Sequence, residues 1–358
     1  MVEPSRILVT IPSWVGDVVM ATPALLALRR RYHRARLVYL LRPYVEDVLD
    51  GLNSADAVIH WPSPAPRPGQ PRRWGELIRR LRREDFDLAV LLTNSFRSAL
   101  TAWLGGSRRR LGYRRDGRGP LLTDPLDPPR IGRRFRPIPA LDYYNALARR
   151  AGCEEPGDQL RLATSAADEE ALHHRLGRLS ADRPLITLNP GANYGSAKCW
   201  PPEYYAQLSD ALVNRHNARV VASLAPRERE IADRLRSAAR RPLEIFVDPP
   251  LGLGPLKALI RRSRLLITND TGPRHFAAAF GVPVVTIFGS SDPAWTDTRF
   301  ALERSVLLAL DCQPCMKRTC PLQHHHCMKQ LMPERVLEVV EDLLAAVPQA
   351  TRPTHSSC

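Results

Sequence analysis

The chain has 358 residues, of which 44% are hydrophobic, so it is long enough for two domains with sizeable cores. No apolar run reaches the roughly 18–20 residues of a transmembrane helix, and no charged leader with a cleavage site precedes the strand-like residues 7–11, so we expect a cytoplasmic protein. The formal charge is +15, and residues 1–150 hold 27 basic and 14 acidic residues, so the first half implies an anionic partner: nucleic acid, an anionic membrane surface or an anionic substrate.

The first half of the chain alternates strand-like and helix-like segments. Apolar runs predict strands at 6–11, 36–41, 56–61 and 87–92, and amphipathic stretches predict helices at 24–32, 74–84 and 141–152. Strands that alternate with helices are typical of a parallel sheet with crossover helices. The segment 114–140 is rich in Pro, Gly and Arg and has little periodicity.

The turn after the first strand reads "PSWVGDV". In many α/β proteins this turn carries several glycines, which allow a phosphate to sit on the following helix N-terminus. Here it holds Gly16 followed by Asp17, whose carboxylate would repel a phosphate. We therefore expect this turn to have a task other than phosphate binding.

A second alternating series starts near residue 184. Strands are predicted at 184–191, 218–224, 242–247, 264–270 and 283–289, and helices at 202–216, 255–262, 272–280 and 333–347. This predicts two Rossmann-like domains at 1–165 and 166–332, the C-terminal helix 333–347 and a flexible tail at 348–358. Ligands of such sheets bind beyond the carboxyl ends of the strands, so we expect one in a cleft between the two facing sheets.

The segment "LLITNDTGPRHFAAAFG" is the most informative part of this second series. A buried strand leads into Asp270, Thr271 and Gly272, where a helix begins, and His275 lies about one turn further. Free backbone N–H groups at such a helix start bind anions, and His275 can face the same ligand. The alternative is an ordinary N-cap formed by Asp270 or Thr271.

Two further segments of the second half carry charged side chains after predicted strands. Lys198 lies on a glycine-containing loop and is the first of only four lysines in the chain, so it is a candidate for a diphosphate contact or a solvated loop residue. Glu228 and Glu230 follow the strand 218–224, where an acid can accept hydrogen bonds from ribose hydroxyls or can simply start a helix.

Three segments, "SWVGDVVMATPAL", "NPGANYGSAKCWP" and "TNDTGPRHFAAAFGVP", together resemble the lipopolysaccharide heptosyltransferases of glycosyltransferase family 9. The "PSWVGD" turn and the segment at 94–124 are most similar to the heptosyltransferase II group of that family. The resemblance covers most of residues 6–347. It implies the GT-B architecture, in which two Rossmann-like domains face a cleft. It also implies inverting transfer of L-glycero-D-manno-heptose from ADP-heptose to the inner core of lipid A, with no metal needed.

The resemblance also implies roles for single residues. Asp17 matches the general base of the family, and Lys198 matches the lysine that contacts the donor phosphates. Glu228 is the better match for the ribose-binding acid, with Glu230 second. Residues 270–272 and His275 match the donor-binding turn, where Asp270 would contact sugar hydroxyls. The helix N-terminus, Lys198 and His275 would offset the charge that gathers on the ADP leaving group.

The basic first half suits an acceptor that carries phosphates and acidic sugars, and it suits peripheral contact with the cytoplasmic face of the inner membrane. The candidate acceptor-binding residues are considered as one group: Arg97, Arg108, Arg109, Arg110, Arg114 and Arg115.

Four of the seven cysteines are grouped in "CQPCMKRTCPLQHHHC", at Cys312, Cys315, Cys320 and Cys327. In a cytoplasmic chain such a group favours a metal over disulfides. Zinc or an iron–sulfur cluster would fit the residue types, although the spacing is not that of a common zinc finger or ferredoxin. Reduced thiols and a disulfide formed by oxidation stay open as alternatives.

Two alternatives to an ADP-heptose-dependent transferase remain. The first is a GT-B transferase with a different nucleotide sugar or acceptor. The second is a basic nucleic-acid-binding protein, against which stands the lack of a helix-turn-helix, zinc-finger or aromatic RNA-binding motif in the sequence.

Overall fold

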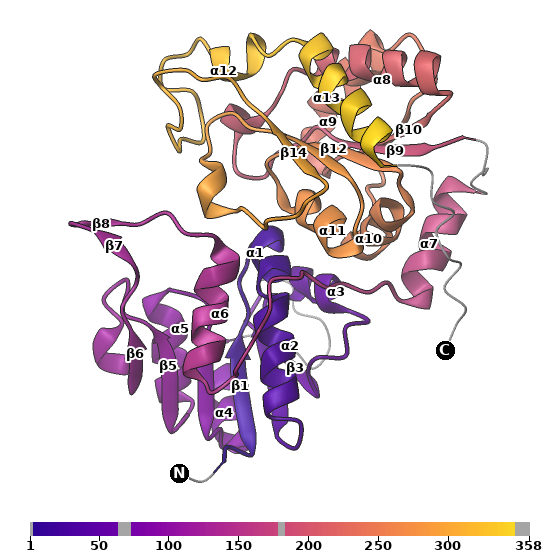
Figure 1. Ribbon diagram of the computed structural model, residues 1–358. Helices are drawn as coiled ribbons and strands as arrows, with labels where there is room; N and C mark the ends of the chain where they lie inside the picture. The colour runs from indigo at the N-terminus through magenta and orange to yellow at the C-terminus, as the bar shows by residue number, and fades with distance from the viewer. Residues whose placement is uncertain (1–2, 64–72, 178–182, 348–358) are drawn as a thin grey trace. The chain divides into compact units, whose positions relative to one another are not determined.

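The computed structural model describes residues 3–63, 73–177 and 183–347 (Figure 1). The predicted tail at 348–358 lies outside these residues. The chain divides into two compact units. We call them the N-terminal unit (Met1–Arg175, Gly252–Ala258 and Pro293–Phe300) and the C-terminal unit (Leu176–Leu251, Leu259–Asp292 and Ala301–Cys358).

The N-terminal unit is built on a six-stranded sheet in the order β3-β2-β1-β4-β5-β6. All five pairs of neighbouring strands in this sheet are parallel. Strands β1 and β4 are apolar almost throughout and buried on both faces, as expected where helices cover both faces of a parallel sheet. The strands are β1 (Arg6–Thr10), β2 (Arg36–Leu41), β3 (Ala57–His60), β4 (Leu88–Leu91), β5 (Arg109–Tyr113) and β6 (Asp124–Leu126).

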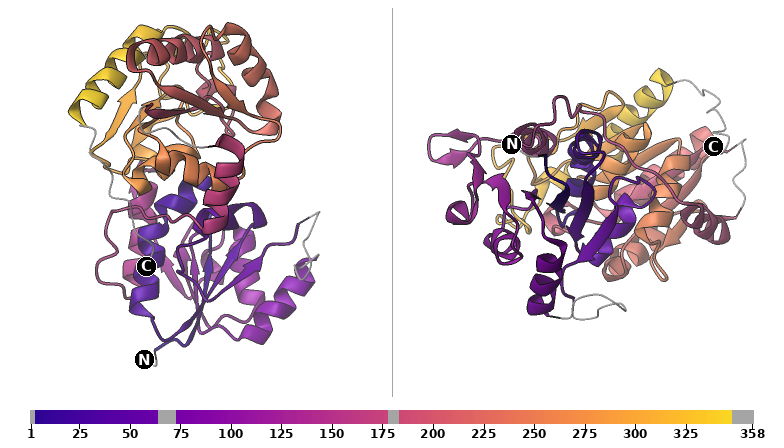
Figure 2. Two further views of the ribbon diagram at one scale, coloured as in Figure 1. Left: turned by 90° about the vertical axis from the view of Figure 1, so that its right-hand side faces the viewer. Right: turned by 90° about the horizontal axis from the view of Figure 1, so that it is seen from below.

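Helices flank this sheet on its two faces (Figure 2). Helix α4 shows why these segments are helical: Leu77, Ile78 and Leu81 recur at helical spacing and are buried, while the helix ends at Asp85 in a left-handed conformation with φ of 48°. The helices are α1 (Val15–Met20), α2 (Thr22–Arg31), α3 (Glu46–Leu49), α4 (Trp74–Glu84), α5 (Phe96–Leu104), α6 (Ala140–Arg150) and α7 (Ala166–Leu176), with 3₁₀ turns η1 (Pro43–Val45) and η2 (Gly119–Leu121). A short antiparallel hairpin joins β7 (Arg130–Ile131) to β8 (Arg134–Phe135).

The C-terminal unit repeats this plan with a six-stranded sheet in the order β11-β10-β9-β12-β13-β14, again with parallel neighbours. One face of the sheet packs on α8, α9 and α13 in a single apolar core, in which the largest buried side chain is Trp200. The strands are β9 (Leu185–Asn189), β10 (Arg219–Ser223), β11 (Glu244–Phe246), β12 (Leu265–Asn269), β13 (Val284–Ile287) and β14 (Glu303–Val306).

Helix α11 (Gly272–Phe280) contacts β12 and β13 and starts directly after β12. Helix α10 (Leu253–Arg262) is divided between the two units at Ala258. The other helices are α8 (Pro202–His216), α9 (Arg229–Ala238), α12 (His326–Lys329) and α13 (Pro333–Ala346), with 3₁₀ turns η3 (Ser196–Lys198), η4 (Pro226–Glu228) and η5 (Pro293–Trp295).

Both sheets thus confirm the predicted fold class, two doubly wound parallel sheets with helices. In each sheet the strand order reverses between two central neighbours, β1 and β4 in one unit and β9 and β12 in the other. Loops that leave the carboxyl ends of such a strand pair diverge to opposite faces and leave a crevice, which is where ligands of this fold bind. Among the described residues, no helix is both long enough and apolar enough to cross a bilayer.

Candidate functional site

Asn269, the last residue of β12, bonds to the loop that follows β9. These two strands are the central neighbours at which the strand order of the C-terminal sheet reverses, and we call that place the switch point of the sheet. Its side-chain amide donates to the carbonyl oxygen of Pro190, at 2.6 Å, in the loop after β9. Its side-chain oxygen accepts from the Trp200 backbone N–H at 3.2 Å and from the Tyr205 hydroxyl at 3.1 Å. Because Asn269 is fully buried, these bonds fix the loop 190–199 against the end of β12.

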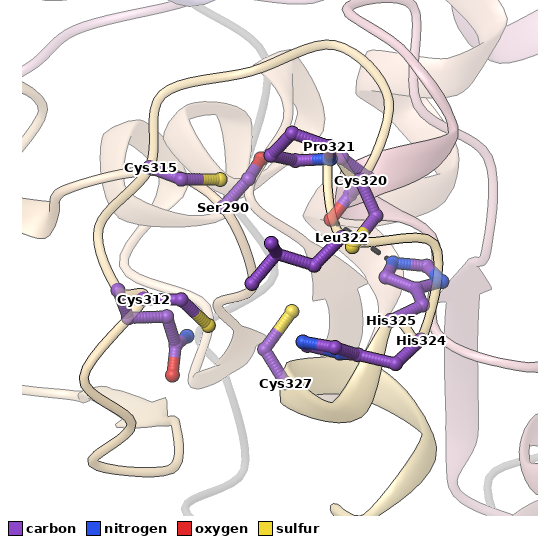
Figure 3. A pocket seen from close by; sticks show the side chains of 11 residues that line it. Ser290, Cys312, Cys315, Cys320, Pro321, Leu322, His324, His325 and Cys327 are labelled. Atoms are coloured by element: carbon purple, nitrogen blue, oxygen red, sulfur yellow. Dashed lines mark hydrogen bonds between the residues drawn. The ribbon is translucent and has the colours of Figure 1, made fainter.

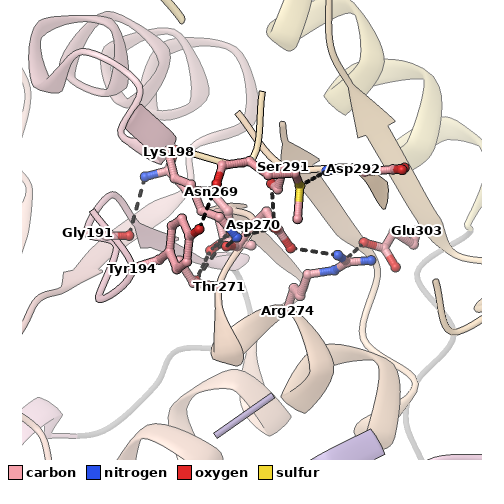
Figure 4. A network of polar contacts seen from close by, with 12 residues as sticks. Gly191, Tyr194, Lys198, Asn269, Asp270, Thr271, Arg274, Ser291, Asp292 and Glu303 are labelled. Carbon is pink, nitrogen blue, oxygen red and sulfur yellow. Dashed lines mark hydrogen bonds and ion pairs between the residues drawn. The ribbon is translucent and has the colours of Figure 1, made fainter. Parts of the chain in front are cut away.

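Asp270 lies at the centre of a buried polar network that Figure 4 shows. The Lys198 ammonium lies 2.5 Å from Oδ2 of Asp270, and the Ser291 hydroxyl donates to the same oxygen at 2.6 Å. Arg274, one helical turn along α11, pairs with Oδ1 at 2.8 Å and with Glu303 at 2.9 Å. The network therefore brings together side chains from the loop after β9, the start of α11, the loop after β13 and β14.

The charge state of this network follows from its burial and its cations. Burial of Asp270 would by itself raise the pKa of its carboxyl, but the charges of Arg274 and Lys198 outweigh that cost and hold the pKa well below the usual range. Asp270 is therefore ionised at any physiological pH. Counted with Glu303, the network holds two cations and two carboxylates, so it carries no net charge. An anionic ligand would therefore be attracted by the Lys198 ammonium, which is not completely buried, and by the start of α11.

The N-terminus of α11 is open to such a ligand. Its N-cap residue, Thr271, has extended dihedral angles, φ of −141° and ψ of 174°, and its side chain makes no capping bond. The Thr271 hydroxyl instead lies 3.1 Å from the Thr268 hydroxyl, and the Asp270 carboxylate is held by Lys198, Arg274 and Ser291. The alternative that Asp270 or Thr271 forms an ordinary N-cap is therefore wrong.

His275 is buried in α11, and its predicted part in offsetting charge needs correction. Burial, and then the neighbouring charges of Arg274 and Lys198, lower the pKa of its imidazole well below the ordinary value. The lowered pKa favours the neutral ring at physiological pH, so this geometry does not support the predicted positive charge of His275 beside a diphosphate. Its Nδ1 has no hydrogen-bond partner among the described residues.

The neutral imidazole predicts a pH effect on stability. An unfolded His275 binds a proton below about pH 6.5, whereas the folded one does not, so acidification favours the unfolded state. We expect the free energy of unfolding to fall between pH 7.5 and 5.5 more steeply in the wild type than in His275→Leu, by at most about 1.4 kcal/mol per pH unit. Urea titrations at the two pH values measure this, and equal slopes for both proteins would show that folding does not lower the pKa of His275.

Glu228 lies in η4, which follows β10, and its carboxylate faces the loop after β9. Its Oε2 accepts from the Ala225 backbone N–H at 2.8 Å, and a Cβ added at Gly191 would collide with its carboxylate. Glycine at 191 therefore makes room for Glu228 at the switch point. Glu230, the second candidate, is exposed in the first turn of α9.

Asp17 lies at the switch point of the N-terminal sheet, in the first turn of α1. The hydroxyl of Tyr144, a buried residue of α6, donates to its Oδ1 at 2.8 Å. Burial and the carboxylate of Asp17 raise the pKa of Tyr144 well above the ordinary value, so the phenol stays protonated and remains a donor. Asp17 is thus a half-buried carboxylate with one oxygen oriented by a neutral donor.

The loop after β4 is fixed next to this pair by a second set of bonds. Asn94 accepts from the Tyr143 hydroxyl at 3.0 Å and from Arg118 at 3.1 Å, and Tyr143 stacks on Tyr113 with ring centroids 3.7 Å apart. Arg118 is fully buried, and burial lowers its pKa to about 10. These contacts tie the ends of β4 and β5 to α6, the helix that carries Tyr144.

The six candidate acceptor-binding arginines are not brought together, which corrects their treatment as one group. Arg108, Arg109 and Arg110 lie at the amino end of β5, the edge opposite Asp17 in a parallel sheet. Each already has partners there. Arg108 pairs with Asp85 and Asp87, and Arg109 pairs with Asp124. Arg110 donates to the carbonyl oxygens of Ser107 and Leu121. The other three follow the carboxyl ends of β4 and β5: Arg97, Arg114 and Arg115.

The cysteine segment borders the donor-side loops but does not form a ready metal centre. The thiols of Cys312, Cys315, Cys320 and Cys327 are free, without disulfides. Within the described ranges, no three His, Cys, Asp or Glu side chains are placed so that they hold a metal ion as they stand. The zinc or iron–sulfur prediction is therefore not shown by this geometry.

Comparison with known proteins decides which family this geometry represents. The model of glycosyltransferase family 9 (heptosyltransferase) matches residues 74–326. The chain belongs to glycosyltransferase family 9. It is 29% identical over 348 residues to lipopolysaccharide heptosyltransferase 2 of Salmonella typhimurium, with 95% of this chain and 99% of that protein covered.

Solved structures of family 9 proteins share the fold of this chain. The structure of Escherichia coli ADP-heptose lipopolysaccharide heptosyltransferase II matches with a TM-score of 0.77 at 26% identity, over 95% of this chain and 99% of that one. A family 9 glycosyltransferase from Veillonella parvula matches with a TM-score of 0.78 at 22% identity, over 96% and 98% of the two chains. The chain is thus a heptosyltransferase of family 9 with a GT-B-like fold, and the predicted resemblance is confirmed.

Three residues of the candidate site, Arg274, Ser291 and Tyr144, were not predicted from the sequence. Arg274 lies at i+4 from Asp270 across a helix start, a spacing that is typical of an ion pair and was a readable signal. Ser291 follows β13 at the same sheet edge, and that position too could have marked it. Tyr144 gave no signal, because its 127-residue separation from Asp17 is closed only by the packing of α6 on α1.

Proposed function

We propose that the chain transfers L-glycero-D-manno-heptose from ADP-heptose to the inner core of lipid A, with inversion and without a metal in the transfer step. The observation that carries the proposal is the cluster of Lys198, Asp270 and Arg274 beside the open N-terminus of α11. Membership of the heptosyltransferase family and the likeness to heptosyltransferase II support the choice of donor and acceptor.

The donor diphosphate is assigned to the C-terminal unit. The backbone N–H of Gly272 and the macrodipole of this nine-residue helix attract its oxygens, whereas Pro273 has no N–H to donate. Lys198 makes the direct charge contact, and Asp270 positions its ammonium. Glu228, held at the end of β10 beside Gly191, is assigned to the ribose hydroxyls. A contact between Asp270 and sugar hydroxyls also stays part of the proposal.

The chemical step needs a base on the acceptor and charge stabilisation on the leaving group. In the proposed reaction the Asp17 carboxylate takes the proton of the acceptor hydroxyl as that oxygen bonds to the anomeric carbon. The bond from this carbon to the β-phosphate oxygen breaks, and its electron pair leaves with ADP. Lys198 and the α11 N-terminus stabilise the negative charge that develops there. A single displacement of this kind inverts the anomeric configuration.

The acceptor is assigned to the carboxyl edge of the N-terminal sheet, where Asp17 lies. Arg97, Arg114 and Arg115 follow strands at that edge and supply cationic groups for phosphates or acidic sugars. The excess positive charge of residues 1–150 also supports peripheral contact with an anionic membrane surface that presents the acceptor.

The test is a transfer assay with the purified chain, ADP-heptose and truncated lipid A cores, read by product mass. We expect the acceptor to gain one heptosyl residue. Parallel reactions with UDP- and GDP-sugars are expected to give no product. Product from another nucleotide sugar, with none from ADP-heptose, would favour the alternative of a GT-B transferase with a different donor. A salt-sensitive DNA shift without nucleotide-sugar binding would instead favour the nucleic-acid-binding alternative.

Tyr144 is expected to tune the proposed base. Its hydrogen bond favours the ionised form of Asp17, so Tyr144→Phe should move the acidic limb of the kcat/KM profile to higher pH. We expect a shift of about 1 pH unit, since a hydrogen bond to a charged group contributes about 1.5–3 kcal/mol. Tyr143→Phe, which removes the neighbouring hydroxyl that bonds Asn94 instead, is the matched control with an unshifted limb. Identical pH profiles for both variants would show that the Tyr144 hydroxyl does not affect the pKa of the proposed base.

A further inference from the structure

Four thiols and two imidazoles of the C-terminal unit line one small cavity. Its walls include all four clustered cysteines together with His324 and His325, and Figure 3 shows these side chains surrounding the hollow. The space inside is about 20 Å³. That is room for one water-sized group, which suits a single ion.

The residues of this lining are soft metal ligands rather than ligands of an organic molecule. Thiolates select ions such as Zn²⁺ and Fe²⁺, and four of them complete a tetrahedral set. The imidazoles have other contacts: Nε2 of His325 lies 3.2 Å from the carbonyl oxygen of Ala197, and Nδ1 of His324 accepts from the His326 backbone N–H at 3.0 Å. The four thiols form no disulfide.

We propose that Cys312, Cys315, Cys320 and Cys327 bind one divalent transition-metal ion, Zn²⁺ or Fe²⁺, in this cavity. Binding replaces four S–H bonds with four metal–sulfur bonds and releases four protons, so no electron transfer is involved. Because the thiols are not yet gathered into a closed set, they turn toward the cavity centre when the ion enters. Three of the four lie on the coil between β14 and α12, where such rotation moves no helix or strand, and Cys327 lies in α12.

The metal-bound segment would brace the loop that carries Lys198. The Tyr194 hydroxyl donates to the carbonyl oxygen of Met316 at 2.9 Å, and the Ala197 backbone N–H donates to that of Arg318 at 3.0 Å. The approach at Arg318 is so close that a Cβ at Gly195 would collide with its carbonyl oxygen. Two backbone positions between consecutive cysteines therefore contact the turn that ends at Lys198.

The same segment also contacts the loop that carries Ser291, the hydroxyl partner of Asp270. The Met316 backbone N–H donates to the carbonyl oxygen of Ser290 at 2.7 Å, and the Gln313 amide donates to that of Gly289 at 2.6 Å. An ion that fixes Cys312, Cys315 and Cys320 would thus fix both loops around Asp270. We infer that the ion fixes the loops that carry Lys198 and Ser291 and contacts no reacting atom.

The first experiment measures metal content of the full-length protein, purified without oxygen and without a metal-affinity tag. We expect about one zinc or iron per chain by mass spectrometry of the elements. Co²⁺ in exchange for the native ion should give the intense absorption of a cobalt–thiolate complex. Cys315→Ser/Cys320→Ser is expected to lose at least nine-tenths of the metal, whereas the control Cys153→Ser, which changes a cysteine of the N-terminal unit, keeps it.

The second experiment measures ADP affinity by calorimetry with and without the ion, and this part rests on the proposed donor site. We expect a roughly tenfold weaker Kd for the double variant and for chelator-treated wild type, and an unchanged Kd for Cys153→Ser. The chelated wild type keeps the test decisive even where the double variant fails to fold. An unchanged Kd after complete metal loss would overturn the bracing role.

Two results would overturn the metal site itself. One is wild-type protein with less than a tenth of an equivalent of metal that also gives no cobalt–thiolate absorption. The other is an intact mass lower by the hydrogens of two disulfides, which would show that the cysteines pair with one another. Failure of the proposed function looks different, because metal-loaded protein would then bind its ion and still form no product from ADP-heptose.

Discussion

Asp17→Asn is expected to lower kcat for heptosyl transfer by about 10²–10⁴-fold, the usual contribution of a general base. The amide keeps the size of the carboxylate and accepts the Tyr144 hydrogen bond, but it cannot take the proton of the acceptor hydroxyl. KM for ADP-heptose should change less than threefold, because the donor is assigned to the C-terminal unit. Steady-state kinetics with a truncated lipid A core measures both parameters.

The matched control for this variant is Asp116→Asn. Asp116 follows β5 at the same edge of the same sheet, is exposed, and has a φ of 52°, a left-handed conformation that asparagine tolerates. Asp116→Asn removes one negative charge at the same sheet edge, as Asp17→Asn does, but leaves the proposed base unchanged. A wild-type rate for Asp17→Asn, or an equal loss in both variants, would remove Asp17 from the chemical step.

Lys198→Met is expected to reduce kcat/KM for ADP-heptose by about 10²–10³-fold. Lys198 serves both binding of the diphosphate and stabilisation of the leaving ADP, so KM should rise and kcat should fall. The fold should survive, because Arg274 and Ser291 still hold Asp270. We expect the free energy of unfolding to drop by about 1–2 kcal/mol, less than the ~3–5 kcal/mol that a buried charge with no partner costs.

The control for Lys198→Met is Lys329→Met, which removes an exposed lysine from α12. Donor kinetics and urea unfolding of both variants separate a loss of function from a loss of fold. Unchanged donor kinetics in Lys198→Met would refute its phosphate contact. Collapse of the fold would show that the Lys198–Asp270 pair is chiefly structural.

Local patterns predicted most of the fold, because each strand and helix carries its own periodicity and end signals. The run at 264–270 is buried on both faces and became β12, and helix α11 begins where Gly272 and Pro273 follow it. The alternation of strands and helices predicted a doubly wound plan for each half, but the order of the strands within each sheet came only from the structure.

The site was predictable only where the chemistry lies next to a strand end. Lys198, Asp270 and Asp17 each follow a central strand of their own sheet, so the sequence order could place each of them at the carboxyl edge of that sheet. The basic run at 108–110 looked equally suited to an anionic acceptor, but strand polarity puts it at the opposite edge. His275 had the right spacing, yet burial removes its charge, and burial is not visible in a short motif.

The central claim is that the base and the diphosphate site belong to different units of the chain. Calorimetric titration of ADP into wild type, Asp17→Asn and Lys198→Met tests it most directly. We predict that Asp17→Asn binds ADP with the wild-type Kd and that Lys198→Met binds it at least tenfold more weakly. Weak binding by Asp17→Asn together with wild-type binding by Lys198→Met would contradict the account.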